Sequence, residues 1–198
     1  MGRNLHLGCF DQPVPGWVNT DVTPHVFLAR VPGMAFLLKA TGLLSEARYR
    51  QHRDGIFRQV RYLDVTKRFP YPDRWFDCVY SSHLLEHLYP EQAASCLAET
   101  RRVLVPGGVV RIAVPDLDRV VGTYDPLDPD AMLRELFEAG QTRNKNRHHW
   151  GYNEASLFRL LGQVGFRDMT RCSYRQGRCT DVAVIDIRPE SLAVEAVK

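Results

Sequence analysis

The sequence predicts an α/β protein: a Rossmann-like, mostly parallel sheet with helices on both faces and an antiparallel C-terminal strand. Two observations predict this fold. Short apolar segments alternate with amphipathic segments along most of the chain, as they do in βαβ units. One unit is complete, because the apolar run 76–82 is followed by a helix-like segment, a Pro-Gly-Gly turn and a second apolar run, 109–114.

The length of 198 residues indicates one domain with a sizeable core. We expect this domain to span residues 1–188, with an insertion at about 25–58 and a partly ordered tail at 189–198. The five cysteines form no CxxC pair and are odd in number, which argues against a disulfide framework. No charged and apolar leader precedes the first predicted strand, so we expect a cytoplasmic protein without a signal peptide.

The N-terminal segments predict two neighbouring strands with an unusual connection. Asn4–Gly8 alternates in polarity and stops at a glycine, and Trp17–Val22 is typical of a second strand with Asp21 near its end. Only the eight residues 9–16 join them, whereas a parallel crossover usually contains a dozen or more residues and a helix. The first crossover helix is therefore expected to be shortened or missing. A third strand is expected over Val60–Val65.

Residues 25–58 combine apolar pieces with a basic run, and we expect one or two helices that form an insertion above the sheet. The chain has a net charge of +3, but residues 25–61 carry seven Lys/Arg residues against two acidic residues. The apolar stretch 26–44 is too interrupted by charges, proline and glycine to span a membrane. We favour a solvent-exposed amphipathic helix here, with peripheral membrane contact as the alternative.

Three helices and a closing strand pair are expected after residue 115. Their predicted bounds are Leu117–Tyr124, Ala131–Gly140 and Glu154–Val164 for the helices, and Phe166–Tyr174 and Thr180–Ile187 for the strands. Asn153 is a suitable N-cap for the last helix, and Gly165 is a suitable stop.

The segment 76–116 carries the most specific motifs of the chain. It contains Phe-Asp-Cys-Val at 76–79, Leu-Glu-His at 85–87 and Arg-Val-Leu-Val-Pro-Gly-Gly at 102–108. These patterns resemble the FDxV, LEH and RxLxPGG motifs of the class I S-adenosylmethionine-dependent methyltransferases, in their small, methyltransferase-11-like form. The resemblance implies this fold, S-adenosylmethionine as the cofactor, and methyl transfer as the activity.

The resemblance also implies a cofactor site at the ends of the strands. In that family, a glycine-rich loop approaches the methionine part of the cofactor, and here only Gly8 matches because Phe10 replaces the second glycine. Asp21 takes the place of the acid at the ribose hydroxyls, and Asp64 that of the acid at the adenine amino group. The cofactor residues implied in this way are Gly8, Cys9, Phe10, Asp21, Asp64, Val65, Ser82 and His83.

Transfer of a methyl group from a sulfonium to an alcohol is an in-line displacement that benefits from a base. The available groups are His83 and Asp116, each following a predicted strand, and His148 and His149 in the loop before the last helix. Of these, His83, Asp116 and His149 are the candidate catalytic residues. This loop, 146–153, also contains aromatic rings that could pack against an adenine, a sugar or a sulfonium. Similar His-x-Trp-x-Tyr segments occur in relatives encoded beside sugar-modifying enzymes, which favours a carbohydrate or other small acceptor.

Residues 83–87 also fit the H-x-x-E-H pattern of zinc peptidases. That pattern requires both histidines on one helical face and a further ligand downstream. Here it directly follows a predicted strand, and no downstream acid stands out, so we expect no metal site. Glu86 and His87 are instead expected to cap and pack the next helix.

We therefore expect methyl transfer to a small-molecule acceptor, with oxygen as the favoured target and the insertion as a lid or acceptor wall. Phe10 and the short first connection would suit a non-catalytic relative that binds a partner. The basic insertion would suit an RNA-directed methyltransferase with salt-dependent binding. A nucleic-acid acceptor is less favoured, because we interpret the insertion as a solvent-exposed amphipathic helix. An adenine N-methylase in particular is disfavoured, because Ser-Ser-His-Leu at 81–84 replaces the Asp/Asn-Pro-Pro-Tyr signature of base-amine methylases. No G-x-G-x-x-G follows the first strand, which argues against a nicotinamide dehydrogenase.

Overall fold

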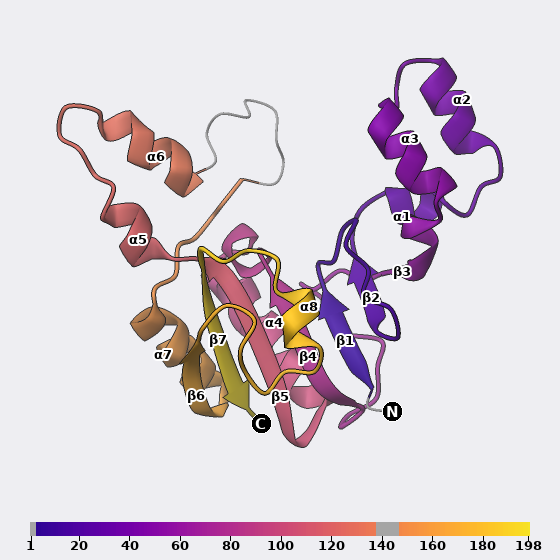
Figure 1. Cartoon of the computed structure of the whole chain (residues 1–198). Coiled ribbons are helices and arrows are strands. Elements are labelled where there is room, and N and C mark those ends of the chain that lie inside the picture. Colours follow the sequence, from indigo (N-terminus) through magenta and orange to yellow (C-terminus); the bar gives the residue numbers. More distant parts are fainter. Residues whose placement is uncertain (1–2, 138–146) are drawn as a thin grey trace.

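The computed structural model describes residues 3–137 and 147–198 and consists of one sheet flanked by helices (Figure 1). Seven strands form this sheet in the order β3-β2-β1-β4-β5-β7-β6. Their bounds are β1 Asn4–Leu7, β2 Val18–Asp21, β3 Val60–Tyr62, β4 Phe76–Ser82, β5 Leu104–Pro115, β6 Arg167–Cys172 and β7 Ser191–Val197. Neighbouring strands from β3 to β5 are parallel, and β7 runs antiparallel to both β5 and β6. The predicted fold class is confirmed.

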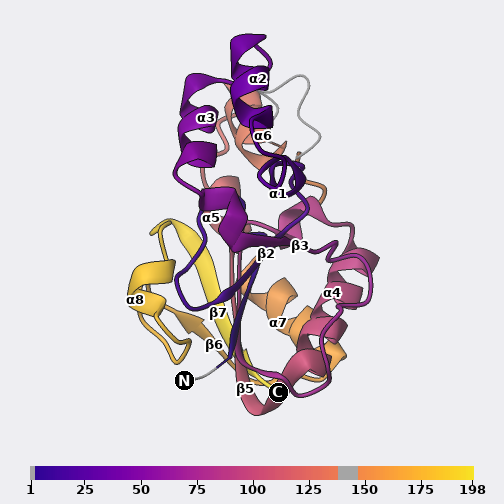
Figure 2. The same cartoon turned by 90° about the vertical axis from the view of Figure 1, so that its right-hand side faces the viewer.

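Helices cover both faces of the sheet. In the described part of the chain they are α1 His25–Leu28, α2 Met34–Ala40, α3 Glu46–Arg53, α4 Pro90–Val103, α5 Leu117–Val121, α6 Pro129–Phe137, α7 Glu154–Val164 and α8 Val182–Ile185, with 3₁₀ turns η1 Ile56–Gln59 and η2 Leu85–His87. Figure 2 shows α4 and α7 on one face and α8 on the other. Asn153 caps α7 and Gly165 ends it, as predicted. The helix predicted over Ala131–Gly140 corresponds to α6, and residues 138–140 lie outside the described residues.

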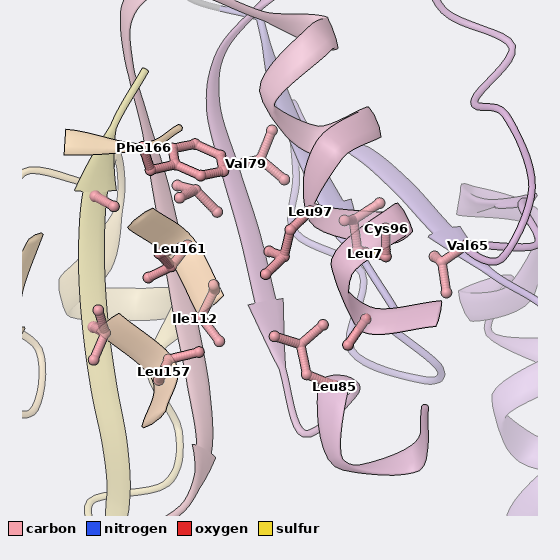
Figure 3. Packing of buried hydrophobic residues seen from close by; sticks show 14 of the residues in the cluster. Leu7, Val65, Val79, Leu85, Cys96, Leu97, Ile112, Leu157, Leu161 and Phe166 are labelled. Atoms are coloured by element: carbon pink, nitrogen blue, oxygen red, sulfur yellow. The ribbon is translucent and has the colours of Figure 1, made fainter. Parts of the chain in front are cut away.

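The main hydrophobic core lies between the sheet and the helices α4 and α7 (Figure 3). Leu7, Val79 and Ile112 come from three neighbouring parallel strands, and they belong to the same cluster as Leu97 of α4 and Leu161 of α7. Each of these side chains is at most 2% exposed. Burying a side chain of this size contributes about 1.5–3 kcal/mol, so this face fixes the strands whose ends form the candidate site.

The connection between β1 and β2 contains no helix, as the sequence predicted. The side chain of Asn19 closes it: Oδ1 accepts the N–H of Val14 at 2.8 Å, and Nδ2 donates to the Val14 carbonyl at 2.9 Å. Asn19 is buried, so these hydrogen bonds are shielded from water and strengthened. The backbone N–H of Cys9 donates to Thr20 at 3.0 Å. The loop after β1 is therefore held directly against β2.

The C-terminal strands differ from the prediction. β6 confirms the first strand of the predicted pair, but Thr180–Ile187 contains the short helix α8 instead of a strand. Residues Ser191–Val197, expected in the tail 189–198, form β7 between β5 and β6. Five consecutive residues of β7 are buried because both faces of this interior strand are covered. The predicted tail is therefore wrong for these residues, which complete the sheet.

A buried ion-pair network ties the segment between β6 and β7 to the sheet. Arg111 of β5 is fully buried, and its guanidinium contacts the carboxylates of Asp186 and Glu195. The bond from Arg111 Nη1 to Glu195 Oε1 is 2.9 Å long. Glu195 also accepts the backbone N–H groups of Arg178 at 2.7 Å and Cys179 at 3.0 Å. The charged groups at the centre of this network are thus all paired.

The insertion forms three helices and a 3₁₀ turn, one helix more than the sequence predicted. Figure 1 shows α2 and α3 projecting beyond the edge at which β1 and β2 end. No residue of α2 is buried, and Phe36 and Leu37 are 62% and 55% exposed. Among the described helices, none has the length and apolar character needed to cross a membrane. Peripheral membrane contact through residues 25–58 stays a prediction.

Candidate functional site

The carboxyl ends of β1, β2, β4 and β5 lie at one edge of the sheet, where open α/β sheets bind ligands. Gly8 follows β1, Asp21 ends β2, Ser82 ends β4 and Asp116 follows β5. The structure therefore brings these four predicted residues to one edge. Asp64 lies two residues beyond the end of β3.

Gly8 begins a tight loop that requires glycine. Its φ of +69° lies in the left-handed region, which glycine adopts without strain. A Cβ at this position would lie 3.1 Å from Cδ1 of Leu84, so a larger residue would also crowd the segment after β4. Cys9 follows and packs with Val26 and Val60 in a small core cluster. Burial raises the pKa of the Cys9 thiol, and its side chain therefore serves packing.

Phe10 packs against the insertion. The guanidinium of Arg48 lies 4.6 Å from the centroid of the Phe10 ring. The rings of His25 and Phe57 lie 6.5 and 6.2 Å from it, measured between centroids. The ring is 38% exposed. Residues of the insertion thus hold the side chain that replaces a glycine of the resembled family.

Asp21 joins the loop after β1 to the loop after β2. Its Oδ2 accepts the backbone N–H of Phe10 at 3.0 Å, and its Oδ1 accepts that of Thr23 at 2.7 Å. Burial raises the pKa of the Asp21 carboxyl, and the two N–H groups oppose this rise. A carboxylate oxygen can accept more than one hydrogen bond. Asp21 can therefore hold both loops and still accept hydrogen bonds from the hydroxyls of a ligand.

Asp64 and Val65 have local partners. Oδ1 of Asp64 accepts the backbone N–H of Thr66 at 3.0 Å and its hydroxyl at 2.6 Å, and Oδ2 lies 3.3 Å from Nζ of Lys67. The hydrogen bond from the Thr66 hydroxyl is the main cause that lowers the pKa of Asp64. Val65 is buried in the main core. Contact of these residues with a cofactor stays a prediction.

His83 follows β4 with a φ of +50° and lies between two side chains. Its Nδ1 is 3.2 Å from Oε1 of Glu86, and its Nε2 is 2.8 Å from Oγ of Ser191. Its backbone N–H donates to the carbonyl of Ala113 at 2.8 Å, which fixes the residue to β5. A carboxylate next to one imidazole nitrogen is the arrangement that orients a histidine base.

Glu86, the neighbour of His83, lines a small pocket together with Leu117, Trp150 and Tyr152. Glu86 is 1% exposed, and neither of its carboxylate oxygens forms a hydrogen bond within the described chain. The hydroxyl of Tyr152, which is 2% exposed, also forms none there. Buried polar groups without hydrogen bonds are uncommon. This pocket is therefore a place where a bound molecule or ion would be stabilised.

The sequence did not identify Glu86 and Tyr152 as ligand-binding residues. They lie in separate segments, one after β4 and one before α7. The fold joins these segments, because the backbone N–H groups of His149 and Trp150 donate to the carbonyl of Glu86 at 2.7 and 3.1 Å. The available signals were the H-x-x-E-H pattern and the aromatic loop, but nothing in the sequence connects the two.

Asp116 and His149 have structural partners of their own. Oδ1 of Asp116 accepts the N–H of Asp118 at 3.1 Å at the start of α5, and Oδ2 lies 2.8 Å from Nη2 of Arg171. The ring of His149 stacks on that of Tyr89, with 4.3 Å between centroids. Neither side chain is among the described residues that line the pocket of Glu86. Their catalytic role stays a prediction.

Known proteins share both sequence and fold with this chain. A family model described as a methyltransferase domain matches residues 39–112, from the insertion to β5. The ubiquinone/menaquinone biosynthesis C-methyltransferase UbiE of Erwinia tasmaniensis is 24% identical over 143 residues, which cover 66% of this chain and 55% of that protein. The chain therefore spans about half the length of this curated relative.

Two solved structures extend the comparison to the whole fold. A possible histamine N-methyltransferase from Thermotoga maritima has a TM-score of 0.56 at 13% identity, over 100% of this chain and 83% of that chain. A SAM-dependent methyltransferase from Archaeoglobus fulgidus has a TM-score of 0.53 at 18% identity, over 100% and 86%. At this level of identity, the likeness concerns the fold. With the matched domain and the strand order, it confirms the resemblance predicted from the sequence: the chain has the fold of the class I S-adenosylmethionine-dependent methyltransferases.

Proposed function

We propose that the protein is an S-adenosylmethionine-dependent methyltransferase that methylates an oxygen atom of a small-molecule acceptor. The main support for the proposal is the contact between the loops that follow β1 and β2. There, the carboxylate of Asp21 accepts the backbone N–H of Phe10, two residues after Gly8. The matched methyltransferase domain and the relative UbiE support this enzyme class and this cofactor.

The residues at this contact fit the cofactor. Gly8 turns the chain directly after β1 with a φ of +69°, and a loop of this kind lets a ligand approach its main chain closely. Asp21 carries a carboxylate whose pKa is raised by burial, and two ribose hydroxyls would stabilise its charge by donating to it. When bound, S-adenosylmethionine supplies a methyl group on a cationic sulfur.

We propose His83 as the residue that accepts the proton of the acceptor hydroxyl. Glu86 lies 3.2 Å from its Nδ1 and would stabilise the imidazolium that forms. Its Nε2 contacts the hydroxyl of Ser191 at 2.8 Å, and an acceptor hydroxyl could take the place of this partner. Asp116 and His149 are the alternative bases, although an ion pair and a ring stack already hold their side chains.

Phe10 supports a second candidate function, a non-catalytic protein that binds a partner or another ligand. Its ring, held by the insertion, replaces a glycine of the resembled family. RNA-directed methylation has less support, because Lys39 and Arg50 of the basic insertion both pair with Glu46. Phosphate contacts would have to compete with these ion pairs.

The test is thermal unfolding and calorimetric titration with S-adenosylhomocysteine. A ligand at about 100 times its dissociation constant adds about 2.7 kcal/mol to native stability, which raises the melting temperature by about 5–10 °C for a chain of this size. Asp21→Ala should weaken binding about tenfold, and Asp54→Ala, which removes an exposed carboxylate of the insertion, should leave it unchanged. Absence of both a thermal shift and a titration heat would favour the non-catalytic function.

A further inference from the structure

We propose that Glu86, His87 and His148 form a binding site for a divalent transition-metal ion. One potential ligand atom from each side chain lies within 4.8 Å of the other two. The sequence predicted no metal site, because His83 and His87 would have had to share a helical face. The structure brings His148, from the loop before α7, into the place that the sequence pattern gave to His83.

Both histidines are oriented by backbone carbonyls. Nδ1 of His87 lies 3.3 Å from the carbonyl oxygen of Arg147, and Nδ1 of His148 lies 3.0 Å from that of Leu136. A nitrogen that donates to a carbonyl carries the hydrogen, so in the neutral ring Nε2 has the lone pair. Metal-binding histidines typically show this pattern, in which one nitrogen donates to the protein and the other binds the metal. The two rings lie 5.0 Å apart between centroids.

Glu86 supplies the negative charge of the site. It is 1% exposed, neither oxygen forms a hydrogen bond within the described residues, and Oε1 lies 3.2 Å from Nδ1 of His83. A buried carboxylate that accepts no hydrogen bond is costly even with a histidine beside it, and a divalent cation would compensate this charge. Two histidines and one glutamate are an established ligand set for zinc. Ligand atoms around zinc lie about 3.4 Å apart for bonds of about 2.1 Å, so small side-chain rotations would close the site.

The cluster opens toward the pocket at the end of β5. Glu86 and His148 both line this pocket, as does Tyr152, whose hydroxyl is buried. Three protein ligands leave a coordination position for water or for an oxygen of a bound molecule. An ion there would polarise an acceptor hydroxyl; this role rests on the proposed methyl transfer, whereas the metal site itself does not.

The experiment titrates Zn²⁺ into the chelator-treated protein, residues 1–198, in a calorimeter. One ion should bind per chain, with a dissociation constant in the micromolar range or below. Glu86→Gln and His148→Asn should each weaken binding at least tenfold, and His87→Asn provides a third variant at a less buried position. His25→Asn is the matched control, because His25 belongs to a separate histidine pair with His52, with 2.9 Å between ring nitrogens.

Circular dichroism confirms that each variant is folded before its titration is interpreted. Absence of stoichiometric zinc binding to the wild type overturns the site, and so does binding that the three cluster variants leave unchanged. Titration of the same samples with S-adenosylhomocysteine reports separately on the proposed function. Zinc binding lost in the cluster variants alone supports the site, whatever the cofactor titration shows.

Discussion

Glu195 and Glu86 are both 1% exposed, yet their surroundings are opposite. Glu195, inside the sheet, accepts a bond from the guanidinium of Arg111 and bonds from two backbone N–H groups. Glu86, at the edge where the parallel strands end, forms no hydrogen bond through its carboxylate within the described chain. The buried charge within the sheet is therefore compensated by an arginine and two N–H groups, whereas the buried charge at the strand ends has only His83, 3.2 Å away, beside it.

The physical reason is the cost of removing a charge from water. A buried carboxylate costs several kcal/mol unless cations or N–H groups compensate it. The network around Arg111 supplies that compensation and holds the segment between β6 and β7. A buried charge that the protein compensates only in part, as at Glu86, is typical of functional sites, where a ligand completes the environment.

The largest effect on stability is expected from a substitution in the buried ion-pair network around Arg111. Arg111→Met removes the buried cation that the carboxylates of Asp186 and Glu195 share and should lower the free energy of unfolding by about 3–5 kcal/mol. Urea denaturation at pH 7 measures this loss. Arg53→Met is the control, because Arg53 and Asp54 form an exposed pair, and it should change stability by less than about 0.5 kcal/mol. Equal effects of the two substitutions would contradict the structural role of the network.

A smaller loss of stability is expected when the pH is lowered, because the protein also buries a histidine side chain, His6. Burial lowers the pKa of His6 from 6.5 to about 4, so the native state keeps this ring neutral while the unfolded chain takes up a proton. Because the unfolded state then binds more protons, the contribution of His6 to the free energy of unfolding is fully present above pH 6.5. This contribution is lost as the pH drops toward 4. The expected loss is about 3 kcal/mol.

Urea denaturation of the wild type and of His6→Gln between pH 7 and pH 4 measures this contribution. The variant should show a shallower decline. His52, whose pKa is also lowered to about 4 by burial, should keep part of the slope. An identical pH dependence in both proteins would show that His6 does not titrate in this way.

The smallest effect on stability is expected from replacing Glu86 by glutamine. Glu86→Gln should leave the free energy of unfolding unchanged or raise it by up to about 1 kcal/mol, because it removes a buried charge that has only His83 beside it and breaks no hydrogen bond. The same substitution at position 195, Glu195→Gln, should cost about 2–3 kcal/mol, because it weakens bonds to a charged acceptor. Urea denaturation of both variants in the presence of a chelator makes the comparison direct. Equal losses would remove the distinction between the two glutamates.

The parallel half of the sheet could be predicted from the sequence because each of its strands is marked by a local pattern of residues. β1, β2 and β4 show apolar periodicity and end at recognisable residues, such as Gly8 and Asp21. β7 escaped prediction because Glu195 interrupts an otherwise apolar run. That glutamate belongs in a strand only when Arg111 lies opposite on β5, and no local pattern reveals such a distant partner.

The candidate site, too, could be predicted only where local patterns identify its residues. Residues at strand ends, such as Asp21 and His83, were found because the topology alone places them at one edge. The meeting of Glu86 with His148 depends on how the loop before α7 returns to η2. The sequence contained each part of this cluster, but only the folded chain brings the parts together.

The position of β7 has a consequence for how the protein is made. β7 is the last of the seven strands to be synthesised, yet it lies between β5 and β6. Until it emerges from the ribosome, β5 presents an unpaired edge, and strand edges of this kind are prone to pair with other chains. During that interval Arg111 also lacks its partner Glu195. A charged residue on this nascent edge acts against premature pairing with other chains.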